Sequence, residues 1–167
     1  MKIAYKSLII TTLLFCFFNA DAQYTKVLMQ KADKGDPSAQ MFLGLCYQEG
    51  NGVEKNDSLA VYWFEKSARK GLSEAQVMLG NCYRYGKGVE KDSTKAFELY
   101  EQASWCGGSL GLDALGDCYY YGIAVERDVI RARYYYSKAA ERGYKKSKIK
   151  YNKIRFKKDE DEILDLD

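Results

Sequence analysis

One period dominates this sequence: Gly35, Gly71, Gly107 and Gly143 follow one another at intervals of 36 residues, with no insertion between them. A Leu-Gly pair, a tyrosine and an alanine recur in the same register. Such self-similarity is the signature of a repeat protein, in which neighbouring units must stack to bury a continuous core. The coincident positions are Leu43, Leu79 and Leu115; Gly44, Gly80 and Gly116; Tyr47, Tyr83 and Tyr119; Gly50, Gly86 and Gly122; Val53, Val89 and Val125; and Ala60, Ala96 and Ala132.

Each unit predicts two helices, which in the first unit cover residues 38–49 and 58–70. Both have an apolar stripe at helical spacing, and neither can hide that stripe alone. We therefore expect an all-α fold, a right-handed α-solenoid of stacked antiparallel helix pairs. The first stripe is Ala39, Phe42, Leu43, Cys46, Tyr47 and Gly50; the second is Ala60, Trp63, Phe64 and Ser67, with equivalents Ala96, Leu99, Tyr100 and Ala103, then Ala132, Tyr135, Tyr136 and Ala139.

Capping residues and glycines agree with these helices. Asp36-Pro37 supplies an N-cap followed by a proline in the first turn, and Asp57, Ser93 and Asp128 stand near the starts of the second helices. Glycines such as Gly50 and Gly52 end the first helix and turn the chain. In the third unit Ala124 replaces the second turn glycine, so we expect that turn to differ in its backbone.

The first 22 residues resemble a signal peptide: a basic start, a short apolar run over residues 8–18, and Ala20-Asp21-Ala22 as a cleavage site. The run is too short for a membrane span of about 20 residues, and we expect no transmembrane segment in the mature chain. Cleavage would expose Gln23, and we therefore expect a periplasmic or secreted protein from a bacterium. A lipid anchor on Cys16 is the weaker alternative, because Phe15 precedes it.

The remaining chain divides into three full pairs and two half-pairs. Residues 23–157 are the predicted solenoid, and residues 158–167 form an acidic tail. The mature chain has 24 basic and 22 acidic residues, a balance that does not predict nucleic-acid binding. Within the solenoid we expect a half-unit at 24–34, full units at 36–71, 72–107 and 108–143, and a capping helix at 144–157.

The repeated residues resemble the Sel-1-like repeat, a relative of the tetratricopeptide repeat. The first unit carries Ala39-Gln40, Leu43-Gly44 and Tyr47, then Gly50-Asn51-Gly52-Val53. The second repeats this pattern, whereas the third is a weaker match, with Gly111-Leu112 in place of Ala-Gln. The resemblance covers residues 24 to about 156. It implies that the protein acts as an adaptor or scaffold, but it gives almost no information about which ligand is bound.

The cysteines do not predict a disulfide framework. Cys46, Cys82 and Cys118 occupy one repeat position, and equivalent stacked helices lie about 8–10 Å apart, too far for the Cα separation of a disulfide. We expect these three to be buried thiols. Cys106 ends a second helix and retains the freedom to pair with Cys118 or with an outside partner. Cysteine-rich relatives carry two cysteines in each unit, a pattern that this sequence lacks.

The composition argues against catalysis. The chain contains no histidine, which removes the commonest general base, and its cysteine spacing offers no tetrahedral metal site. No cofactor motif is present. Asp113 and Asp117 lie four residues apart on one predicted helix, either as a paired acid and base or, as we favour, as two solvated carboxylates. We therefore predict a protein that is not an enzyme; the alternatives are a hydrolase acting on β-lactam or cell-wall-type substrates, and a structural envelope component.

The predicted partner is another protein or peptide, bound on the concave face. In the related tetratricopeptide fold this face is lined by the side of each first helix opposite the packed stripe. Buried tyrosine and arginine are the usual energetic anchors of such contacts. The charged C-terminal blocks are interpreted as solvated ends, with a docking tail as the alternative. The predicted binding residues are Met41, Leu45 and Gln48; Val77, Asn81, Arg84 and Tyr85; and Asp113, Asp117, Tyr120 and Tyr121.

Overall fold

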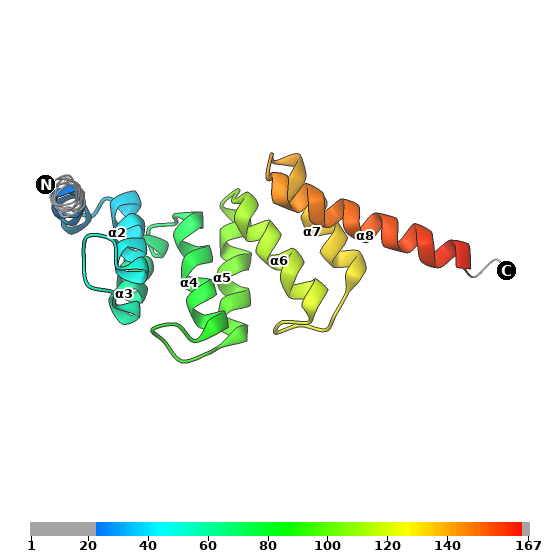
Figure 1. The fold of residues 1–167 in the computed structure, drawn as a ribbon, viewed down its shortest axis with the longest axis horizontal. Coiled ribbons are helices and arrows are strands. Elements are labelled where there is room, and N and C mark those ends of the chain that lie inside the picture. Colours follow the sequence, from blue (N-terminus) through cyan, green and yellow to red (C-terminus); the bar gives the residue numbers. More distant parts are fainter. Residues whose placement is uncertain (1–22, 165–167) are drawn as a thin grey trace, which may run out of the picture.

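The computed structural model describes residues 23–164, with side chains as far as residue 154. The predicted signal peptide and the last residues of the predicted acidic tail lie outside the described residues, and over the described range every regular element is a helix. The chain is an all-α solenoid (Figure 1), as the 36-residue period predicts. A helix over residues 23–33 comes first and is followed by α2 (Pro37–Glu49), α3 (Asp57–Ala68), α4 (Ser73–Tyr85), α5 (Ser93–Trp105), α6 (Ser109–Tyr121), α7 (Val129–Glu141) and α8 (Lys145–Leu164).

The helices stand side by side in chain order, and the two ends of the described chain lie at opposite ends of the row (Figure 1). Each helix from α2 onward packs against the next one along the chain, and α4 also contacts α6. Three pairs result, α2 with α3, α4 with α5 and α6 with α7, which are the three full units expected from the period. Contacts between successive units make the core continuous.

One aromatic ring from each second helix forms the centre of its unit. Phe64, Tyr100 and Tyr136 have 0%, 0% and 2% of their surface exposed. Each ring lies against the glycine of the repeated Leu-Gly pair, and a Cβ built on Gly80 would stand 2.5 Å from a ring carbon of Tyr100. The glycine is therefore a slot for the ring, which explains why it recurs within a helix, where glycine is otherwise unfavourable.

Helix caps follow the sequence closely. Asp36 accepts a hydrogen bond of 2.7 Å from the Ala39 amide, with Pro37 in the first turn. The second helices begin at the expected places, although the capping side chains of α3 and α5 are Asn56 and Asp92, one residue earlier than the residues named from the pattern. Asp128 caps α7 as expected.

The turn after α6 keeps the conformation of its equivalents, contrary to expectation. Ala124 adopts φ 60°, close to the φ of 70° at Gly52 and 71° at Gly88. The surrounding unit imposes the left-handed conformation on this alanine, at a cost of about 1–2 kcal/mol. The packing of the two helices, repeated from the other units, thus outweighs a local backbone preference.

Two expectations about individual positions are wrong. Phe42, assigned to the apolar stripe, is 47% exposed. Among the described residues one helix precedes α2, whereas a full pair precedes α4 and α6, so fewer described side chains cover this end of the core. The capping helix continues past residue 157 to Leu164, because no glycine or proline interrupts the sequence between Lys145 and Leu164.

The cysteines behave largely as small core residues. Cys82 and Cys118 are buried thiols, and their burial raises the pKa of Cys82 to about 11 and that of Cys118 to about 12. Cys46 is only half-buried, so full burial at that position was a wrong prediction, while Cys106 is an exposed thiol. Because the thiolate is the reactive form, Cys82 and Cys118 are protected from oxidation and alkylation in the folded chain.

Candidate functional site

The side chains predicted to bind a partner share one side of α2, α4 and α6, here called the first-helix surface. The structure does not expose them equally. Val77 is buried, with 5% of its surface exposed, and Met41 and Leu45 are half-buried because they pack against the core. Tyr85 and Tyr121 are 58% and 64% exposed. The half-buried remainder is Gln48, Asn81, Arg84, Asp113, Asp117 and Tyr120.

Two of these residues hold the central rings of their units. The Tyr100 hydroxyl donates a hydrogen bond of 2.8 Å to Asn81 Oδ1, and the Tyr136 hydroxyl donates one of 2.7 Å to Asp117 Oδ1. These pairs stand 36 residues apart, and in the first unit the same two positions are the apolar Leu45 and Phe64. The second and third units thus pair a ring hydroxyl with an acceptor on the facing helix, whereas the first unit has neither group. Burial raises the pKa of both phenols, so both rings stay neutral and donate.

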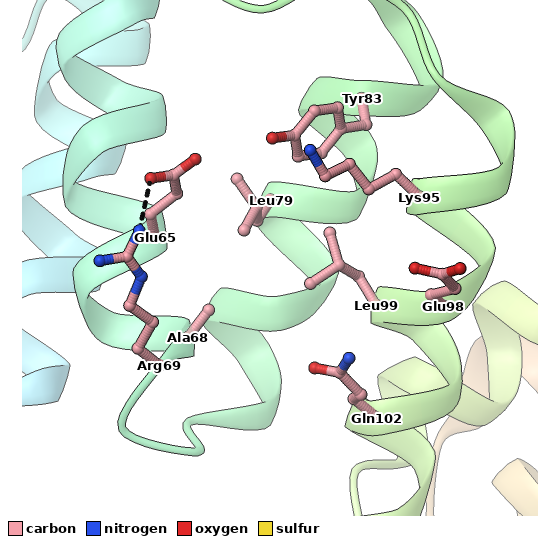
Figure 2. A pocket seen from close by; sticks show the side chains of 9 residues that line it. All are labelled: Glu65, Ala68, Arg69, Leu79, Tyr83, Lys95, Glu98, Leu99 and Gln102. Carbon is pink, nitrogen blue, oxygen red and sulfur yellow. Dashed lines mark hydrogen bonds and ion pairs between the residues drawn. The ribbon is translucent and has the colours of Figure 1, made fainter.

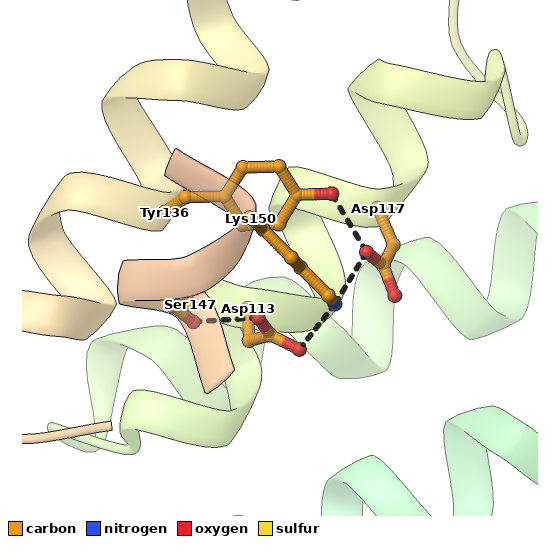
Figure 3. Close-up of polar contacts among 5 residues, drawn as sticks. All are labelled: Asp113, Asp117, Tyr136, Ser147 and Lys150. Atoms are coloured by element: carbon orange, nitrogen blue, oxygen red, sulfur yellow. Dashed lines mark hydrogen bonds and ion pairs between the residues drawn. The ribbon is translucent and has the colours of Figure 1, made fainter. Parts of the chain in front are cut away.

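Asp113 and Asp117 are paired with a lysine and are not solvated carboxylates, so the solvated interpretation is wrong (Figure 3). Lys150 of α8 reaches down between them, with its Nζ 2.8 Å from Asp113 Oδ2 and 2.7 Å from Asp117 Oδ1. The Ser147 hydroxyl donates a further bond of 2.5 Å to Asp113 Oδ1. The two carboxylate side chains are only 13% and 21% exposed.

The electrostatics of this cluster favour a charged lysine. Burial alone would lower the pKa of Lys150, but the hydrogen bonds and negative charges of Asp113 and Asp117 outweigh burial and raise it. The ammonium group and two acceptors form a closed network that also includes the Tyr136 hydroxyl. This network attaches α8 to the third unit, and the Lys150 ammonium occupies the space between the two carboxylates.

What remains accessible is an edge of tyrosines and arginines, here called the tyrosine edge. It consists of Arg84 and Tyr85 at the end of α4, Tyr120 and Tyr121 at the end of α6, and Arg127 in the loop after α6. The Arg84 guanidinium lies 5.1 Å from the ring centroid of Tyr85. Arg127 lies 5.8 Å from that of Tyr120, and the rings of Tyr120 and Tyr121 meet edge to face at 4.9 Å. These contacts hold large side chains in place without burying them, which suits them to contact another molecule.

A second feature, which the sequence reasoning missed, is a groove of about 320 Å³ between α3 and α5, with α4 as its floor (Figure 2). Leu79 and Tyr83 on α4 lie about 200° around the helix from Asn81 and Val77, so this groove opens on the side away from the first-helix surface. The ion pair of Glu65 with Arg69 borders it on α3. The complete lining is Glu65, Ala68, Arg69, Leu79, Tyr83, Lys95, Glu98, Leu99 and Gln102.

The described part of the chain contains neither a cluster of metal ligands nor a membrane-spanning helix. No group of three or more histidine, cysteine, aspartate or glutamate side chains there is placed to hold a metal ion. None of the helices between residues 23 and 164 combines the length and the apolar character needed to cross a bilayer.

Comparison with protein families gives a match over nearly all of the pairs. The family model described as Sel1 repeat matches residues 37–72, 73–104 and 109–144. These three segments coincide with the pairs α2–α3, α4–α5 and α6–α7. Among curated proteins, none matches the sequence significantly.

Several solved bacterial structures are similar. A Sel1 repeat protein from Oxalobacter formigenes has a TM-score of 0.75 and 33% identity, covering 80% of this chain and 54% of that one. A protective antigen present in uropathogenic Escherichia coli strains, which displays the same repeat fold, has a TM-score of 0.59 and 32% identity, covering 74% and 34%. The chain thus spans about half and one third of these two proteins. Helicobacter pylori cysteine rich protein B, at 24% identity and a TM-score of 0.62, covering 75% and 93%, shares the fold.

Proposed function

Because the chain belongs to the Sel1 repeat family, whose members are generally non-catalytic scaffolds for protein interactions, we propose that it binds an extended segment of another protein along its concave, first-helix surface. The tyrosine edge is the main contact. The proposed contact contains fewer residues than the binding surface predicted from the sequence. Asp113 and Asp117 are left out because they pair with Lys150, and Val77 is left out because it is buried.

The observation that carries the proposal is the exposure of Tyr85 and Tyr121, at 58% and 64%, next to Arg84 and Tyr120. A folded chain gains little from leaving two large rings in water at equivalent positions of successive units. A phenol contributes both apolar area and a hydrogen-bonding hydroxyl, and tyrosine and arginine dominate the energetics of many interfaces. Equivalent positions on stacked helices also repeat at a regular spacing, which suits an extended segment.

The proposal predicts that binding depends on these two tyrosines. Peptides selected from a displayed random library against the full chain should bind the Tyr85→Ala/Tyr121→Ala variant at least about tenfold more weakly, as expected when two aromatic anchors are removed. Isothermal titration with the selected peptide measures this loss. Thermal unfolding should change little, because both side chains are largely exposed.

The matched control is Tyr62→Ala/Tyr134→Ala, which removes two tyrosines that are 47% and 56% exposed on the second helices α3 and α7. This variant should bind the selected peptide as the parent does. Equal losses in both variants, or no loss in the first, would show that the tyrosine edge is not the contact.

We propose further that the protein is exported from a bacterial cell, with residues 1–22 removed as a signal peptide. Support comes from the basic start, the short apolar run and the Ala20-Asp21-Ala22 site, and the similar solved structures are bacterial. Expressed as the full chain, the protein recovered outside the cytoplasm should have an intact mass that begins at Gln23. Recovery of the chain with Met1 attached in that fraction would contradict cleavage.

A further inference from the structure

One repeat position distinguishes the second unit from its neighbours. Trp63, Leu99 and Tyr135 stand at equivalent places on α3, α5 and α7, so the first and third units carry an aromatic ring where the second has leucine. The tyrosine on the facing first helix is present in all three units, as Tyr47, Tyr83 and Tyr119. Among the three units, only the second therefore lacks an aromatic ring beside this tyrosine, which is Tyr83.

The third unit shows what an aromatic ring does at this place. Tyr135 stacks on Tyr119 with 5.4 Å between ring centroids and 6° between planes, and Phe97 of α5 meets Tyr119 edge to face at 5.9 Å. In the first unit, Trp63 and Tyr47 both pack against the N-terminal part of the core. A stacked or edge-to-face aromatic pair contributes about 0.5–1.5 kcal/mol beyond the area it buries.

In the second unit, the shorter side chain leaves the groove between α3 and α5 (Figure 2). Its apolar surface comes from Ala68, Leu79 and Leu99, and the Lys95 ammonium lies 4.6 Å from the ring centroid of Tyr83. Arg131 covers Tyr119 in the same manner at 5.5 Å, while Tyr135 is stacked on that ring. A cation at this position is therefore compatible with a second ring in the groove.

We propose that the groove receives one aromatic side chain of a partner protein, which takes the place that Trp63 and Tyr135 fill in the neighbouring units. Its volume of about 320 Å³ is sufficient for one such side chain. Glu65, Glu98 and Gln102 border the groove as hydrogen-bond acceptors for the amides that flank the inserted residue. This is a second contact site, on the side away from the tyrosine edge and independent of it.

The test is a titration of the isotope-labelled chain with N-acetyl-L-tryptophanamide, followed by amide chemical shifts. We expect saturable shifts confined to residues around Ala68, Leu79 and Leu99, with a dissociation constant of about 1 mM, as befits one ring without a flanking chain. N-acetyl-L-leucinamide should bind at least tenfold more weakly. Equal binding of the two probes, or scattered shifts without saturation, would overturn the proposal.

The decisive variant is Leu99→Tyr, which supplies the ring that the third unit carries. It should fold, with a thermal midpoint at or above that of the parent, and it should lose the shifts caused by the tryptophan probe. Ile149→Tyr adds the same side chain at a position of α8 that is 70% exposed and should leave probe binding unchanged. Unchanged binding by Leu99→Tyr would refute the site. Self-association of the parent that Leu99→Tyr abolishes, without probe binding, would assign the groove to a second copy and overturn the proposal.

Discussion

Replacing Gly80 by alanine is expected to lower the free energy of unfolding by about 2–3 kcal/mol, although alanine is the better helix former by about 1 kcal/mol. The new Cβ would stand 2.5, 2.9 and 3.2 Å from three ring carbons of Tyr100. That ring cannot move aside, because it is fully buried and its hydroxyl is hydrogen-bonded to Asn81. Urea unfolding followed by circular dichroism measures the change.

Gly107→Ala is the matched control, because it adds the same methyl group where no atom lies within 4 Å. The φ of Gly107 is 83°, so backbone strain, at about 1–2 kcal/mol, should be the whole cost of this substitution. A second substitution, Tyr100→Leu, removes the obstructing ring and should make Gly80→Ala far less harmful than it is in the parent. If Gly80→Ala costs no more than Gly107→Ala, the ring slot does not explain the repeated glycine.

Replacing Lys150 by methionine should cost about 2 kcal/mol and loosen α8. The change keeps most of the side chain's volume but leaves Asp113 and Asp117 facing each other without a cation. Breaking a fully buried pair costs about 3–5 kcal/mol and an exposed pair about 0–1. This cluster is intermediate, since Lys150 is 35% exposed and the carboxylate side chains are 13% and 21% exposed. Hydrogen exchange should show reduced protection of α8 amides up to residue 154.

The direction of the Lys150 pKa shift decides the pH at which the stability of the Lys150→Met variant should be measured. A lysine whose pKa is higher in the folded chain stabilises it fully below the unfolded value of about 10.5, and that contribution is lost as the pH rises through the folded value. Unfolding at pH 7 therefore measures the whole effect.

Lys138→Met provides the comparison for Lys150→Met. Lys138 forms a surface ion pair with Glu141 at 2.9 Å, with side chains 43% and 60% exposed, so its loss should change the free energy of unfolding by less than about 0.5 kcal/mol. In the Lys150→Met background, Asp113→Asn together with Asp117→Asn should restore part of the loss by removing the opposed charges. Similar small effects of the two lysine substitutions would mean that the network does not hold α8.

The sequence predicted the residues of the binding surface only in part. Helical spacing placed Tyr85, Arg84 and Tyr121 on one side of their helices, because direction around a helix depends on residue number alone. It could not show that Lys150 would fill the space between Asp113 and Asp117, since that contact joins residues 37 and 33 positions apart and depends on where α8 docks. The groove beside Leu99 was not predicted from the sequence for a different reason. Aligning Trp63, Leu99 and Tyr135 would have revealed the missing ring, but only the packed helices turn a shorter side chain into a cavity.

The sequence by itself determined the number of helix pairs, the approximate ends of their helices and the rings at the centre of each unit. These depend on local preferences and on a period that every unit repeats, so each copy reinforces the same interpretation. The tertiary structure alone decided the features that differ between units: the left-handed alanine at Ala124, the exposure of Phe42, the carboxylates closed by Lys150 and the open groove of the second unit. Each of these depends on which neighbour a unit has on either side, and a repeat pattern describes the unit without describing its neighbours.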